Sequence, residues 1–111
     1  MHILCIFLHD NRYLEDFLEV LLEEEIEEIF VSNAEELKEV LAFKFPLFKE
    51  LQITMGGRRR EPKIIFALVD KEEKIKRMVD LWKEELQIDK EEIATVFSFP
   101  VKVWQISPHI Y

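Results

Sequence analysis

The chain has 111 residues, of which 49% are hydrophobic and 34% charged, and its formal net charge is -8. This length fits one domain over residues 1–111 and leaves no room for a second. The acidic balance argues against nucleic acid or an anionic membrane as the main partner, and a single cysteine, Cys5, excludes a disulfide within the chain.

The chain also lacks the signals of secretion and membrane insertion. It has no apolar segment of 18 residues, and its first residues do not resemble a signal peptide. A cytoplasmic location is therefore expected. Glu and Lys supply most of the charge, which is a feature of heat-adapted proteins and points to a thermophilic source.

The first third of the chain predicts a strand, a helix and a second strand. Ile3–Leu8 is a continuous apolar run, typical of a central strand buried on both faces. Asp10 or Asn11 then caps a helix with apolar residues at helical spacing, which runs to about Glu24. A short strand over 26–31 follows.

The next segment predicts one short helix and a long connection. Asn33 and Glu36 have the spacing of a capping box, which predicts a helix over Ala34–Leu41 with Leu37 and Leu41 inward. Residues 42–62 form the irregular part of the chain. A connection of this length is either functional or flexible.

The last part of the chain repeats the strand-helix-strand order. Ile64–Val69 is a second apolar run, and Asp70 with Glu73 forms a capping box for a helix that carries apolar residues as far as Leu86. A charged turn over Asp89–Glu92 leads to a fourth strand over 93–99. Pro100 breaks this strand, and residues 101–106 predict a short edge or intersubunit strand.

The order β-α-β-β-α-β predicts the fold class. It indicates an α+β, ferredoxin-like two-layer sandwich with one antiparallel sheet, two main helices on one face and a short extra helix.

The run from Gly56 to Arg60 is the local feature that most resembles a binding site. Gly56 and Gly57 can adopt positive φ and expose successive N–H groups, while Arg58, Arg59 and Arg60 offer guanidinium groups suited to phosphate or carboxylate. An anion site is one interpretation. The other is a turn whose arginines pair with the acidic first half or with a neighbouring subunit.

His9 is a second candidate ligand-binding residue, because it follows the first strand at an end where ligands often bind; a capping or surface role is the alternative. The histidines and Cys5 lack metal-ligand spacing, so no metal site is predicted. No catalytic set is recognisable, and a non-enzymatic protein is expected. An enzyme acting on a small metabolite stays a third possibility.

Two further features concern surfaces. Five glutamates around the end of the first helix oppose the helix dipole, and a bound cation, an Arg-rich partner or simple solvation would accommodate them. Large apolar residues in 43–51, with Trp104, Ile110 and Tyr111, either cover the sheet or form a subunit interface.

Several motifs resemble the nitrogen-regulatory P-II superfamily, especially its short, poorly characterised members. These are Phe99-Pro100-Val101, the Val-Trp-x-Ile pattern at 103–106, and the run 45–70 with its F-P-L-F, G-G-R-R-R and I-I-F-A-L-V-D segments. The resemblance implies a ferredoxin-like subunit in a compact homotrimer whose sheets face the threefold axis.

P-II proteins proper bind ATP or ADP between subunits, partly through a glycine-rich loop before the last core strand. Asp89–Glu92 takes that position here without a glycine, so no nucleotide-binding residue is carried over and no cofactor is assigned. The long loop that contacts target proteins in the family is replaced by the short helix and the apolar segment.

The leading hypothesis is a trimeric P-II-like regulatory protein that senses a small anionic ligand or binds a protein partner at clefts between subunits. The alternative is a divalent-cation-binding trimer that resembles the cation-tolerance proteins. Its distinguishing feature would be carboxylates and histidine that converge in a cleft.

Overall fold

The structure is a computed structural model that describes residues 1–54, 57–86 and 92–108. Four strands form one sheet in the order β2-β3-β1-β4, and every neighbouring pair is antiparallel. The strands are β1 (His2–Leu8), β2 (Ile29–Asn33), β3 (Lys63–Val69) and β4 (Ala94–Pro100). This arrangement confirms the predicted ferredoxin-like α+β fold.

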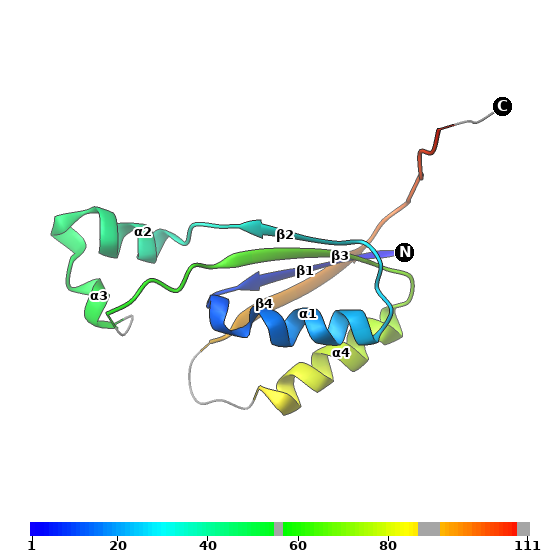
Figure 1. Cartoon of the computed structure of the whole chain (residues 1–111), viewed down its shortest axis with the longest axis horizontal. Coiled ribbons are helices and arrows are strands. Elements are labelled where there is room, and N and C mark those ends of the chain that lie inside the picture. The colour runs from blue at the N-terminus through cyan, green and yellow to red at the C-terminus, as the bar shows by residue number, and fades with distance from the viewer. Residues whose placement is uncertain (55–56, 87–91, 109–111) are drawn as a thin grey trace.

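Two long helices cover one face of the sheet (Figure 1). They are α1 (Leu14–Glu23) and α4 (Glu72–Glu85), and each turns an apolar stripe toward the strands. The core between the layers contains side chains from both helices and from alternate positions of β1 and β3. Its buried residues include Leu4, Ile6, Phe17, Leu21, Ile65, Met78 and Trp82. The rings of Phe17 and Trp82 join the two helices, with centroids 4.8 Å apart.

The opposite face of the sheet is apolar and uncovered by the described residues. It carries five phenylalanines whose side chains are about 40% to 70% exposed, which together we call the open face: Phe7, Phe30, Phe66, Phe97 and Phe99. The prediction that β1 is buried on both faces is therefore wrong for the single chain, because Phe7 is 42% exposed. The prediction that β1 is central is confirmed.

The helix starts differ from two of the three capping predictions. Asp10 does cap a turn, since its carboxylate accepts the N–H of Arg12 at the start of the 3-10 helix η1 (Asn11–Tyr13). Asp70 caps nothing: the N-cap of α4 is Lys71, without a side-chain bond. The carboxylate of Asp70 pairs instead with Lys74, one turn along the helix, at 3.2 Å.

The short helix α2 (Leu37–Lys44) begins three residues later than predicted. Asn33 ends β2, and its side-chain oxygen accepts from Lys63 on β3, so it is not a helix cap. Leu37 is the first residue of α2 and is 70% exposed although it was expected inward, while Leu41 is half-buried. The buried side is formed by Glu39 and Ala42.

The connection between β2 and β3 contains more helix than predicted. After α2 come the 3-10 helix η2 (Pro46–Phe48) and the short helix α3 (Leu51–Thr54). Gln52 on α3 donates to the carbonyl of Ala42 at 2.7 Å, which ties α3 to α2. This α2–α3 extension projects beyond one end of the sheet (Figure 1).

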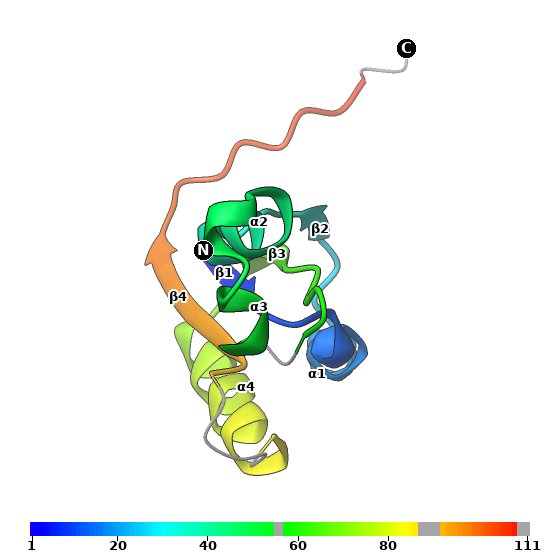
Figure 2. The ribbon, with the colours of Figure 1, turned by 90° about the vertical axis from the view of Figure 1, so that its left-hand side faces the viewer.

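The C-terminal segment 101–108 forms no strand in the described chain. It leaves the domain on the side of the sheet away from the helices (Figures 1 and 2). Trp104 is 79% and Ile106 is 96% exposed, so these side chains do not cover the sheet of their own chain. Ile110 and Tyr111 lie outside the described residues, as does the charged turn over 87–91.

One of the glutamates that follow α1 has a partner within the chain. Glu24 pairs with Arg77 on α4 at 3.0 Å, and this bond lowers the pKa of Glu24. The contact joins the two core helices at the surface. Among the described residues, no helix has the length and apolar character needed to cross a membrane.

Candidate ligand-binding site

The Gly-Arg run lies between the end of β1 and the helix α2. Gly57 is exposed and has φ of +74°, the left-handed conformation that glycine adopts without strain. Gly56 lies outside the described residues. Two backbone bonds fix the segment on either side: Asn11 donates to the carbonyl of Arg60 at 2.9 Å, and Ala34 donates to that of Pro62 at 3.1 Å.

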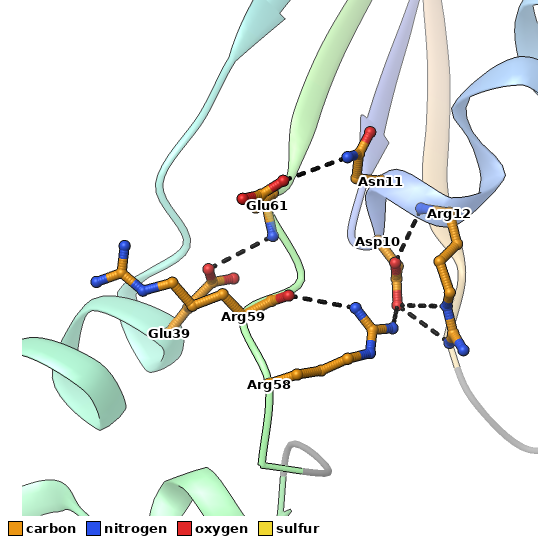
Figure 3. Close-up of polar contacts among 7 residues, drawn as sticks. All are labelled: Asp10, Asn11, Arg12, Glu39, Arg58, Arg59 and Glu61. Carbon is orange, nitrogen blue, oxygen red and sulfur yellow. Dashed lines mark hydrogen bonds and ion pairs between the residues drawn. The ribbon is translucent and has the colours of Figure 1, made fainter.

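Arg58 forms an ion pair with a carboxylate of its own chain. Its guanidinium forms an ion pair with Asp10, which directly follows β1 and is only 3% exposed (Figure 3). The same carboxylate accepts from the backbone N–H of Arg12 at 3.0 Å and from its guanidinium at 3.2 Å. Asp10 thus holds the Gly-Arg run against the end of the sheet.

These bonds also set the protonation of Asp10. Burial by itself raises the pKa of Asp10, but the backbone bond from Arg12 and the charged contact with Arg58 outweigh it, so the pKa falls below its ordinary value. The carboxylate is therefore charged at neutral pH, and its charge is matched by two guanidinium groups.

Arg59 points to a different neighbour. Its guanidinium lies over the ring of Phe43 on α2, 5.6 Å from the centroid. Its backbone carbonyl accepts from Arg58 at 3.2 Å. Arg60 is half-buried and contributes its carbonyl to the bond with Asn11. Arg58 and Arg59 therefore do not act as one fork, because their guanidinium groups have separate partners.

A cavity of about 330 Å³ opens between α2, the end of β2 and the segment before β3, and Arg59 is part of its wall. Four of the side chains that line it are carboxylates, Glu35, Glu36, Glu39 and Glu61. Three are cationic, Lys44, Arg59 and Lys63. The wall thus offers both signs of charge, a composition suited to a small polar ligand.

Glu39 is the buried charged group of this cavity, with 9% exposure. One oxygen of its carboxylate, Oε1, accepts from the backbone N–H of Glu61 at 3.4 Å (Figure 3). The other, Oε2, is buried and has no hydrogen-bond partner in the described chain. Glu61 itself has φ of 51°, a conformation that is strained for a residue with a side chain.

His9 lies beside this cavity, in a neighbouring recess whose walls include Phe7, Glu36 and Pro62. Its Nδ1 is 3.4 Å from Glu36, and its Nε2 is 3.3 Å from the hydroxyl of Thr95 and 3.9 Å from Glu92. Glu36 borders both spaces. The structure thus brings His9 near the Arg59 cavity but not into its wall.

No group of three or more His, Cys, Asp or Glu side chains is placed to hold a metal ion in the described part of the chain. The carboxylates of the cavity wall are separated by their own partners. Glu35 pairs with Lys44 at 3.0 Å, and Glu61 accepts from Asn11 at 3.3 Å. The convergence expected of a cation-binding protein is not found among these residues.

The sequence interpretation missed Glu39, and the chain carried one signal for it. Glu39, Ala42 and Phe43 are spaced to share one side of a helix, and two of the three are apolar. A glutamate on the apolar side of a short helix is a candidate buried carboxylate. That signal was hidden because the capping prediction placed Leu37 and Leu41 on the inner side.

Comparisons with known proteins support the fold assignment alone. No family model matches the chain, and no curated protein matches it in sequence. Among solved structures, the chain is similar to the PII protein of Arabidopsis thaliana bound to citrate, with a TM-score of 0.52 and 14% identity. The match covers 90% of this chain and 77% of the PII chain. The chain therefore has a PII-like, ferredoxin-like fold.

Proposed function

We propose that the protein is a trimeric P-II-like regulatory protein without catalytic activity, located in the cytoplasm, that senses a small ligand or binds a protein partner at the clefts between its subunits. The fold likeness to a PII protein supports this proposal. The acidic charge of the chain disfavours nucleic acid and anionic membranes as partners.

The observation that carries the assembly is the open face. Five exposed phenylalanines share this face of the sheet. The rings of Phe7 and Phe97 contact each other edge to face, with centroids 5.1 Å apart. A monomer rarely leaves an apolar patch of this kind uncovered. A second and third copy, placed with their open faces together, would bury it.

The anion-binding role is assigned to the Gly-Arg run, with Arg59 as the contact residue. The PII protein in the solved structure holds citrate, a small carboxylate. Arg59 lines the cavity, and its guanidinium stacks on Phe43 without a carboxylate partner in the described chain. Arg58, Arg60 and Gly57 shape the segment that presents Arg59, and His9 borders the site through Glu36. Gly56 is assigned to the same site from the sequence alone.

The α2–α3 extension offers a protein partner further apolar contacts beside those at the clefts. Its exposed apolar side chains include Leu37, Phe45, Leu47 and Ile53, which are 51% to 87% exposed. The α2–α3 extension that carries them lies beyond one end of the sheet (Figure 1). These side chains stay available when the open faces are joined.

The assembly is tested by light scattering on the purified chain. We expect a solution mass three times the 13.4 kDa of one chain. Phe66→Lys places a charge at the centre of the open face and should yield a folded monomer, because a buried unpaired charge opposes association. Ile53→Lys, at an exposed position on α3, is the matched control and should keep the trimer. A wild-type monomer would refute the proposal.

A further inference from the structure

The buried carboxylate of Glu39 lacks half of its hydrogen bonding. Its Oε1 has one long bond at 3.4 Å, and its Oε2 has none in the described chain. An unsatisfied buried polar atom is costly and is rare in native proteins, and for a charged group the cost is larger. Because Glu39 is one of the residues that line the cavity, a donor bound there, met by a turn of the buried carboxylate, would remove the cost.

The other carboxylates of the cavity wall already have partners. Glu35 bonds to Lys44, Glu36 lies beside His9, and Glu61 accepts from Asn11. Glu39 is therefore the carboxylate of the described wall that still lacks a hydrogen-bond donor. Lys63, the nearest cation on β3, donates to Asn33 and not to this carboxylate.

The cavity also presents a cation whose donors are available to a ligand. Arg59 is exposed, and its guanidinium lies over the ring of Phe43 without a hydrogen bond to another described residue, so its N–H groups are available to a ligand. One wall thus offers an acceptor at Glu39 and another offers donors at Arg59. A molecule that fills both needs carries an ammonium group and an acidic group.

We propose that this cavity binds a small zwitterion of the amino-acid class, whose ammonium group donates to the carboxylate of Glu39 and whose carboxylate accepts from Arg59. The volume of about 330 Å³ lies at the lower end of the range for small-molecule sites, which suits a ligand of this size. A metal ion fits less well, because Ca²⁺ takes six to eight oxygen ligands and no such group is present among the described residues.

This inference names the ligand class for the regulatory role proposed above and rests on that proposal for its biological use. The wall described above is supplied by one chain, so the binding can be measured on a monomer as well as on an assembly. A monomer that binds the zwitterion would refute the trimer and leave this inference standing. A trimer that does not bind the zwitterion would support the proposed assembly and refute this inference.

The test is a titration of the full chain by calorimetry and amide NMR with glycine, β-alanine and γ-aminobutyrate, which differ in the distance between their charged groups. Propylamine and propionate, each with one of the two groups, are the ligand controls. We expect saturable binding of at least one zwitterion, at least about tenfold tighter than either control, since each charge-assisted bond is worth at least about that factor.

Two variants assign the ends of the ligand. Glu39→Gln removes the charge and keeps the shape, and should weaken both the zwitterion and propylamine at least about tenfold. Arg59→Gln should weaken the zwitterion and leave propylamine unchanged. Glu35→Gln is the matched control: it removes an equal charge from the same wall, where Lys44 already pairs with it, and should change the affinity less than about threefold.

Two results would overturn the inference. One is the absence of saturable binding for all three zwitterions below about 10 mM. The other is an equal loss of affinity in Glu39→Gln and Glu35→Gln, which would reduce the effect to the general acidity of the wall. The thermal unfolding of each variant is measured beside the titration, because a folded Glu39→Gln chain makes either result conclusive.

Discussion

Asp10 shows how one side chain can organise a distant part of the chain. Its carboxylate closes the first turn after β1, and it anchors Arg58, which is 48 positions away in the sequence. The described part of the site is therefore held by an ion pair between the buried carboxylate of Asp10 and the half-exposed side chain of Arg58. A group that makes three charged or backbone bonds in a nearly buried position contributes to stability through its ionised form.

The first prediction concerns Asp10→Asn. This change removes the charge that holds Arg58 and Arg12, and we expect a loss of about 1–3 kcal/mol in the free energy of unfolding at pH 7, measured with urea. The folded pKa of Asp10 lies below its ordinary value of 3.8, so the stabilisation is present above that value and disappears as the pH falls through the folded pKa.

The difference between wild type and Asp10→Asn should therefore be constant above about pH 5 and shrink as the pH falls below about 4. Asp70→Asn is the control, since Asp70 is more exposed and pairs only with Lys74 along the helix. It should change stability little. A gap between wild type and Asp10→Asn that persists at low pH would contradict the assignment of Arg58 to this carboxylate.

The sequence alone could not place these residues. The Gly-Arg run was recognisable as a turn rich in donors, but which carboxylate each arginine meets depends on a contact across the end of the sheet. Asp10 was correctly predicted as a cap, and its second role was invisible because nothing local links it to Arg58. The unsatisfied oxygen of Glu39 depends on which face of α2 is buried, and the sequence pattern predicted the face of Leu37 and Leu41 instead.

At the scale of the elements, the end of α1 contains an unusual choice of residue. Glu25 has φ of 60°, and the N–H of Ile26 returns to the carbonyl of Leu21 while that of Glu25 returns to Leu22. This is the pattern of a helix that ends in a left-handed residue, a position where glycine is strongly preferred. A side chain at such a position costs about 1 kcal/mol or more.

The second prediction follows from this geometry. Glu25→Gly should raise the free energy of unfolding by up to about 1 kcal/mol, because it removes the strain and an acidic charge near the negative end of the helix. Chemical unfolding monitored by circular dichroism gives the value. Glu27→Gly, two residues on and outside the left-handed region, should be neutral or destabilising. A stabilisation of equal size in both variants would exclude the explanation by backbone strain.

The elements themselves were mostly predictable, and the errors have a common cause. The apolar runs of β1 and β3 and the stripes of α1 and α4 are long enough for their periodicity to outweigh local signals. Capping-box spacing was less reliable: Asp70 forms an ion pair with Lys74, and Asn33 accepts from a neighbouring strand. A polar side chain near a helix start takes the partner that tertiary structure supplies.

At the scale of the whole molecule, the open face and the C-terminal segment belong together. The segment 101–108 leaves on the side of the open face, and it carries the exposed apolar residues Val103, Trp104 and Ile106 (Figure 2). Its backbone is held at Val101, which donates to the carbonyl of Met1 at 3.0 Å, and it forms no strand in the described chain. An intersubunit role for these residues stays a prediction that a single chain cannot display.

Removal of residues 102–111 tests that role. We expect the truncated chain to unfold at nearly the wild-type temperature at low protein concentration, because the removed residues that the structure describes make few contacts with the core. Its assembly should dissociate at a protein concentration at least about tenfold higher than for wild type, since burial of one tryptophan alone contributes more than that factor. Analytical ultracentrifugation over a dilution series measures the change. Unchanged dissociation would assign the segment another role.

The antiparallel sheet with β1 at its centre was predictable from the β-α-β-β-α-β sequence of elements, because few topologies join such units without crossed connections. What the sequence could not distinguish was a covered sheet from an open one. Five phenylalanines on alternate positions are equally compatible with a third layer from the same chain and with a neighbouring copy. The exposed side chains of residues 101–108 favour a neighbouring copy, because this segment does not cover the sheet of its own chain.

Cys5 is a chemical probe of how often the middle of this sheet opens. It is the sole thiol of the chain, it lies at the centre of β1 opposite Phe66 and Phe97, and it is 2% exposed. Burial also raises its pKa, so the reactive thiolate is scarce. The rate at which an alkylating reagent modifies Cys5 therefore reports how often the middle of the sheet opens, and each change that loosens or seals that region is recorded as a faster or slower covalent reaction.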